Sequence, residues 1–149
     1  HSDRTRAFFC LLAAQKPLYL DNGEPIPVDG VVVSHSNRRP RHHVFPQAQL
    51  KNHFSARVYN GLCNICFLVS MDNLAIGSKL PRNYLSLYRA EGARQFSRVM
   101  KSHLIPVGTD AGVWESGVVK AFKRFREERR KLICSEFEEQ AGMRLFRRP

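Results

Sequence analysis

Several features that define common protein classes are missing from this sequence. The apolar run 8–14 is far too short to span a membrane, because a spanning helix needs about 20 apolar residues. No secretory signal is visible, and no internal repeat or low-complexity tract occurs. A glycine-rich phosphate loop is also lacking, so we expect any nucleotide hydrolysis to reside elsewhere in a longer parent protein.

Cysteine is scarce as well. The four cysteines do not form the spaced framework of a disulfide-rich secreted domain, and we expect reduced thiols in a cytoplasmic protein. Cys63 and Cys66 form one Cys-x-x-Cys pair, which is half of a zinc site, but no second pair exists. We favour two buried thiols here, and a zinc-stabilised interaction domain stays open as an alternative.

Acidic residues are few relative to basic ones. The chain holds 13 Asp and Glu against 24 Lys and Arg, which gives a net charge of +11 and a pI near 10.1. Such an excess predicts attraction to a polyanion, and DNA is the first candidate. The length of 149 residues fits a single domain. Because the chain starts at His1 rather than Met, we expect a fragment of a longer protein.

The spacing of apolar residues predicts an α+β fold in which helices dominate. Apolar positions recur at helical spacing within 1–16, while prolines and an Asn-Gly pair predict turns over 17–30. The β-branched residues at 31–34 predict a short strand. From 81 to 142 apolar stripes predict further helices, broken at Gly92. The longest stripe runs from Val118 to Phe137, with Arg and Glu expected on the opposite, exposed face.

The stretch 41–81 combines polar residues with two predicted strands and a helix. His42–Phe45 is the first predicted strand, and residues 48–54 are expected to form one or two helical turns. Asn64–Val69 is the second predicted strand. A helix that carries Asn73 is expected to follow it.

The histidine pair, two of the asparagines and a lysine of the stretch 41–81 can gather around one divalent cation and one phosphate. Cleavage of a phosphodiester requires an activated water and a group that stabilises negative charge on phosphorus, and a metal ion can supply the second. A histidine with a pKa near neutrality can supply the first. Neighbouring strand positions point to opposite sides, so we predict different tasks for His42 and His43. The constellation predicts a ββα-metal nuclease, a hairpin plus helix embedded in a mostly helical domain.

Three blocks of the sequence resemble an HNH endonuclease in their order and spacing. They read H-H-V-F-P-Q from position 42, N-G-L-C-N-I-C-F-L-V from position 60 and N-L-A-I-G-S-K-L-P-R-N-Y-L from position 73. Within that family the chain is most similar to the C-terminal nuclease domain of GmrSD-type and SspE-type DNA restriction proteins. The resemblance extends to S-H-L-I-P at 102–106 and to the segment 122–133, and covers roughly residues 5–140.

The resemblance implies an activity, a setting and a partner domain. The whole chain, 1–149, would be one HNH nuclease domain that nicks DNA or cuts both strands. Its setting would be prokaryotic restriction and defence against phage. An N-terminal nucleotide-hydrolysing or sensing domain would belong to the parent protein and be absent from this fragment.

The resemblance also implies a role for each motif position. His43 matches the general base that activates water, and Asn64 matches the middle Asn that braces the base and its loop. His42 and Asn73 match the two metal ligands, and Asn60 is expected to brace the turn. Lys79 is similar to a phosphate-contacting Lys of the family. From their positive charge we also expect contacts to DNA phosphate from Arg82, Arg38, Arg39 and Arg41.

The ligand pair bears on the choice of metal. Many relatives carry Asp where His42 stands, so both expected protein ligands, His42 and Asn73, are neutral here. Magnesium prefers hard oxygen ligands, whereas imidazole suits softer ions. We therefore expect one divalent cation, Mg²⁺ or one of Mn²⁺, Ni²⁺ and Co²⁺, with the last three supporting activity at least as well as Mg²⁺.

Other interpretations stay open at this point. A non-catalytic basic module that retains the HNH fold would bind DNA with a steep salt dependence but cleave none. The basic turn 36–41 is equally consistent with a solvated loop and with a phosphate-contacting rim. We expect His53 and His103 to be structural or surface residues, and His35 is a further candidate for DNA contact.

Overall fold

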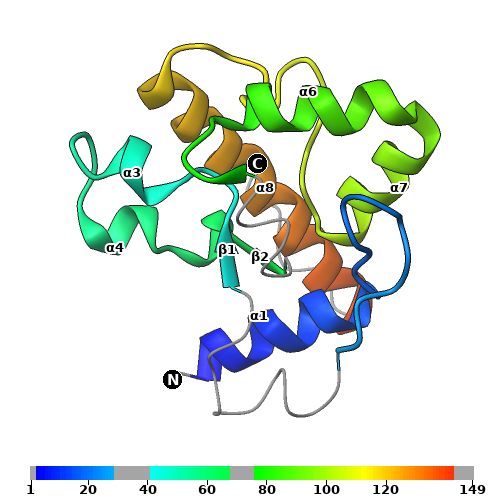
Figure 1. Ribbon diagram of the computed structural model, residues 1–149. Helices are drawn as coiled ribbons and strands as arrows, with labels where there is room; N and C mark the ends of the chain where they lie inside the picture. The colour runs from blue at the N-terminus through cyan, green and yellow to red at the C-terminus, as the bar shows by residue number, and fades with distance from the viewer. Residues whose placement is uncertain (1–2, 29–40, 68–75, 143–149) are drawn as a thin grey trace.

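The computed structural model describes residues 3–28, 41–67 and 76–142, and it combines helices with one small antiparallel sheet (Figure 1). The predicted α+β class is therefore confirmed at this level. The elements in chain order are α1 (Asp3–Ala14), β1 (Arg41–His43), α3 (Gln47–Leu50), α4 (Ala56–Tyr59), the 3-10 turn η1 (Leu62–Asn64), β2 (Ile65–Phe67), α6 (Pro81–Glu91), α7 (Ala93–Ser102) and α8 (Val118–Gln140). Among these helices none is both long and apolar enough to cross a membrane.

β1 is shorter than predicted and shifted, and β2 starts one residue later than predicted. β1 and β2 pair antiparallel, with His42 opposite Cys66 and His43 opposite Ile65. β1 starts one residue before the predicted strand and ends at His43, because the chain turns into α3 directly after Pro46. Asn64 lies in η1 and not in the strand, and residues 68 and 69 lie outside the described residues.

All three residues of β2 are buried, because the hairpin lies between two hydrophobic clusters. Alternate side chains of a strand point to opposite faces. Cys66 therefore joins the larger cluster, while Ile65 and Phe67 join the smaller one, in which Phe67 packs against Phe9 of α1 with ring centroids 5.6 Å apart. The aromatic residues of the larger cluster are Phe45, Tyr84, Phe96, Phe122 and Phe125.

The helices after position 81 follow the predicted stripes closely. Pro81 occupies the first turn of α6, where its missing N–H costs nothing, and Gly92 separates α6 from α7. α8 runs diagonally across the molecule in Figure 1. Its predicted stripe is wrong at Val119 and Leu132, which are 37% and 40% exposed. Its predicted polar face is wrong at Arg129, which is 0% exposed.

Two short helices between the strands complete the frame of the hairpin. α3 forms one turn, the shorter of the two predicted lengths, and α4 was not predicted because four residues give no periodic signal. The predicted strand 31–34 and the predicted helix around Asn73 lie outside the described residues.

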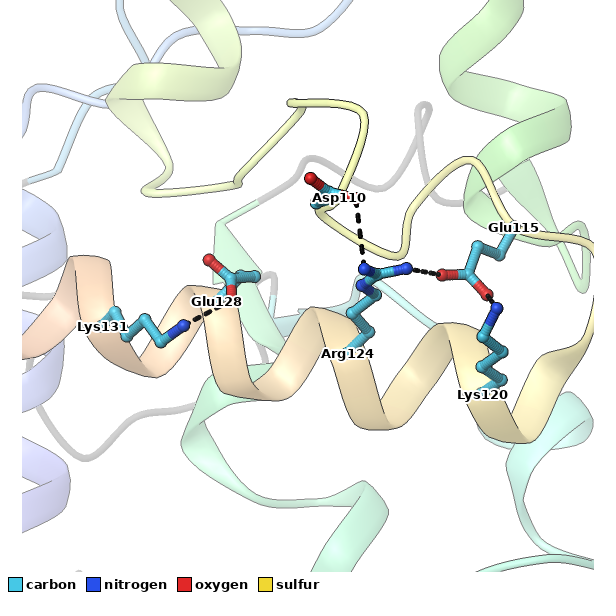
Figure 2. A network of polar contacts seen from close by, with 6 residues as sticks. All are labelled: Asp110, Glu115, Lys120, Arg124, Glu128 and Lys131. Atoms are coloured by element: carbon cyan, nitrogen blue, oxygen red, sulfur yellow. Dashed lines mark hydrogen bonds and ion pairs between the residues drawn. The ribbon is translucent and has the colours of Figure 1, made fainter.

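Ion pairs hold the loop before α8 against that helix (Figure 2). Arg124 Nη1 lies 2.9 Å from Glu115 Oε1, and its Nη2 lies 3.1 Å from Asp110 Oδ1. Backbone packing is close here too, because a Cβ on Gly112 would lie only 2.4 Å from the Ala121 carbonyl oxygen. The loop is therefore fixed on α8 by both charge and shape.

Candidate active site

A cleft of about 320 Å³ opens beside the end of β1 and the start of α3. Both histidines of the pair line it, although their strand positions alternate. His42 is 5% exposed, whereas His43 is only half-buried. The other lining residues are Pro46, Gln47, Ala48, Gly77 and Ser78.

The ring of His43 is held at one nitrogen. Its Nε2 lies 3.0 Å from Asn60 Oδ1, and the Gln47 side-chain amide donates to the same oxygen at 2.6 Å. An amide oxygen only accepts hydrogen bonds, so His43 Nε2 carries the proton in this arrangement. Burial lowers the pKa of His43 below its usual value, with the Asn60 bond opposing that shift in part. The ring is therefore neutral near pH 7, with the lone pair of Nδ1 left to accept a proton.

His42 provides one candidate metal ligand. The residue is buried opposite Cys66, whose thiol donates to the His42 carbonyl oxygen at 3.7 Å. An imidazole in a cleft of this kind suits a borderline divalent ion. The second expected ligand, Asn73, lies outside the described residues. In the part of the chain that the structure describes, no group of three or more His, Cys, Asp or Glu side chains gathers as a metal site.

Asn64 is fully buried and bonds only to backbone in the contacts described. Its Oδ1 accepts from the Phe45 amide at 2.8 Å, and its Nδ2 donates to the carbonyls of Phe45 and Tyr59 at 3.0 and 2.9 Å. These bonds fasten the end of β1 to the turn that precedes β2. Asn64 thus braces the loop, while the ring of His43 is contacted by Asn60.

Arg129 of α8 lies behind the same turn. Its guanidinium donates three hydrogen bonds of 3.0 Å, to the carbonyls of Cys63, His103 and Leu104. Burial lowers the pKa of Arg129, but a guanidinium keeps its charge in proteins. One buried cation therefore ties η1 to the end of α7 and to α8, and fixes the backbone that positions Asn64.

The residues expected to contact DNA are described in part. Lys79 and Arg82 are exposed and follow Gly77 and Ser78, which line the cleft. A hydrogen bond of 2.9 Å from Gln49 to the Ser78 carbonyl ties this segment to α3. Arg41 opens β1, although its side chain lies outside the described residues, as do Arg38 and Arg39.

The four cysteines are all free thiols, as predicted. Cys10 and Cys134 are exposed, Cys66 is buried and Cys63 is half-buried, so burial of the Cys-x-x-Cys pair is correct for Cys66 and partial for Cys63. Burial raises the pKa of Cys66 to about 12. A zinc ligand must be a thiolate, so this thiol is disfavoured as a ligand in this surrounding.

No protein-family model, curated protein or solved structure matches this chain. Any function must therefore be argued from the cleft and the residues around it.

Two residues that position the site were not predicted from the sequence. Gln47 stands four residues after His43 at the start of α3, and nothing in its type signals a role. Arg129 did carry a signal. It follows Phe122 and Phe125 and precedes Ile133 at helical spacing, which places it on the apolar face of α8.

Proposed function

We propose that this chain is a metal-dependent DNA endonuclease of the HNH, or ββα-metal, type. The observation that supports it most is the neutral His43, held through Nε2 with Nδ1 left as a base, beside His42 in one cleft. The net charge of +11 supports a polyanionic substrate. A role in prokaryotic restriction, with a separate sensing domain, belongs to the same proposal.

His43 and the residues around the cleft have distinct tasks in this mechanism. His43 Nδ1 takes a proton from the attacking water, and Asn60 stabilises the positive ring that results. Asn64 keeps the loop in place. Lys79 and Arg82, which are exposed and follow the cleft-lining Gly77 and Ser78 in the chain, neutralise phosphate charge.

The described residues supply one of the two protein ligands expected for a divalent cation. His42, together with Asn73, would hold one such ion, which when bound supplies charge stabilisation at the phosphate. Since both ligands are neutral, we expect Mn²⁺, Co²⁺ and Ni²⁺ to support cleavage at least as well as Mg²⁺.

Plasmid cleavage at low salt tests the proposal. We expect conversion of supercoiled to open-circle or linear plasmid with divalent metal, and none with EDTA. His43→Ala should reduce the rate by at least about 100-fold, the usual contribution of a general base, while DNA binding is kept. The matched control is His53→Ala, an exposed histidine on the connection between the strands, which should leave the rate unchanged.

The outcome that contradicts the proposal is equally specific. Tight, salt-dependent DNA binding without cleavage in any of the four metals would support the non-catalytic binding module instead. Lys79→Ala and Arg82→Ala test whether these two side chains contact DNA phosphate. Each should lower the affinity for all DNA sequences alike, and reduce the slope of log affinity against log salt concentration by about one.

A further inference from the structure

The contacts around Asn60 assign a task to Gln47. Two groups converge on Asn60 Oδ1: the Nε2 of His43 at 3.0 Å and the side-chain amide of Gln47 at 2.6 Å. Gln47 Nε2 also lies 3.3 Å from His43 Nε2. Since Asn60 Oδ1 can only accept, both nitrogens donate to it, and with His43 Nε2 protonated neither nitrogen accepts from the other.

The orientation of the Asn60 amide decides which nitrogen of His43 carries the proton. With Oδ1 toward the ring, His43 Nε2 must donate and Nδ1 keeps its lone pair. If the amide rotated by half a turn, its NH₂ group would face the ring and favour the opposite tautomer. Asn60 is exposed, so burial alone does not fix its orientation. The donor of Gln47 fixes it, because the oxygen of the Asn60 amide can accept this hydrogen bond and the NH₂ group cannot.

We infer that Gln47 is a positioning residue that holds the Asn60 amide in the orientation that selects the Nε2–H tautomer of His43. The importance of that tautomer rests on the proposed function, in which the opposite nitrogen accepts the proton from water. The contact is specific to Gln47, because Gln49 on the same helix donates instead to the Ser78 carbonyl.

The ring nitrogen signals of His43 in ¹⁵N-labelled protein report the tautomer directly. At a pH of about 8.5 the ring is neutral, and we expect the Nε2–H form to dominate in the wild type. Gln47→Ala should shift the tautomer ratio by about fivefold toward Nδ1–H, the effect of losing one ordinary hydrogen bond. The matched control Gln49→Ala should leave the ratio unchanged.

A double variant makes the test sharper. An aspartate at position 60 accepts through either oxygen, so its orientation no longer matters. Gln47→Ala combined with Asn60→Asp should therefore restore the Nε2–H tautomer that Gln47→Ala loses. In cleavage assays Gln47→Ala should lower kcat roughly threefold to tenfold with KM for DNA unchanged, and the double variant should recover kcat.

Each result separates the inference from the proposed function. An unchanged tautomer in Gln47→Ala would overturn the inference, whether or not cleavage falls. Loss of kcat that the double variant fails to recover would overturn it too, since Gln47 would then act on the substrate itself. A tautomer shift in a protein whose wild type cleaves no DNA would support the inference and overturn the nuclease function.

Discussion

The turn between the strands has a buried inner side and an exposed outer side, and each side carries one asparagine. On the inner side Asn64 is fully buried and its three hydrogen bonds all reach backbone groups. On the outer side Asn60 is exposed and bonds to two side chains. The same amide thus fixes backbone when it is buried and contacts an imidazole ring when it is exposed. The comparison predicts that stability depends on the inner side and activity on the outer side.

The largest loss of stability is expected on removal of Arg129, the buried cation behind the inner side of the turn. Arg129→Ala removes three charged hydrogen bonds and leaves buried carbonyls without donors, so we expect a loss of about 4 kcal/mol in the free energy of unfolding. Urea denaturation measures it. Arg130→Ala, the exposed neighbour, should change stability by less than about 0.5 kcal/mol. Equal losses in both variants would show that the buried bonds contribute little.

The next largest loss of stability is expected on substitution of Asn64. Asn64→Ala leaves a buried amide of Phe45 and the carbonyls of Phe45 and Tyr59 unpaired, and we expect a loss of about 3 kcal/mol. Thermal or urea unfolding gives the value. If Asn64→Ala and Asn60→Ala lost the same stability, the division between inner and outer sides would be wrong.

Stability should also depend on pH, because of the buried side chain of His103. This ring is buried, donates to the Leu18 carbonyl at 2.7 Å, and burial lowers its pKa to about 4. Between pH 6.5 and 4 the unfolded chain binds a proton that the folded chain does not, so stability falls as pH falls through this window. The fall attributable to His103 is at most about 3 kcal/mol.

A variant that cannot titrate at position 103 separates the contribution of His103 to the pH dependence of stability from that of the Asp and Glu side chains. His103→Gln keeps a donor near the Leu18 carbonyl, and the difference in unfolding free energy between wild type and variant should shrink as the pH falls below 6.5. A difference that does not vary with pH would mean that His103 titrates normally in the folded state.

The smallest effect on stability, below about 1 kcal/mol, is expected at Asn60. Asn60→Ala removes only exposed contacts, yet His43 loses the acceptor that orients its ring. We therefore expect cleavage to fall at least tenfold, a modest share of the usual general-base contribution, with the melting temperature almost unchanged. A loss of activity that merely follows a loss of folded protein would remove the distinction between the two asparagines.

Much of the frame could be predicted from the sequence, because its signals are local. Pro81 and Gly92 bound α6. Tyr84 and Leu85 of α6, and the apolar stripe of α7, are buried as spacing predicts. A charged residue such as Arg129 is ordinarily exposed, and only its spacing on α8 hinted otherwise.

The site was predictable only as a set of residue types. The stretch around His43 was identified, but the contacts of Asn60 and Asn64 depend on how η1 and α4 turn the chain, and neither element has a periodic pattern. Gln47 was missed because its task depends on one shared oxygen, which no spacing rule encodes. Pairwise geometry of this kind appears only in three dimensions.

The position of Arg129 also has a consequence for synthesis on the ribosome. The histidines and both asparagines emerge first, but the cation that fixes their turn arrives more than 60 residues later, since Cys63 and Arg129 are 66 positions apart. A nascent chain that stalls before α8 would thus have the histidines and both asparagines without the cation that fixes their turn. Limited proteolysis of chains stopped at residue 117 would show an open turn at 60–64, whereas a protected turn would refute this order of assembly.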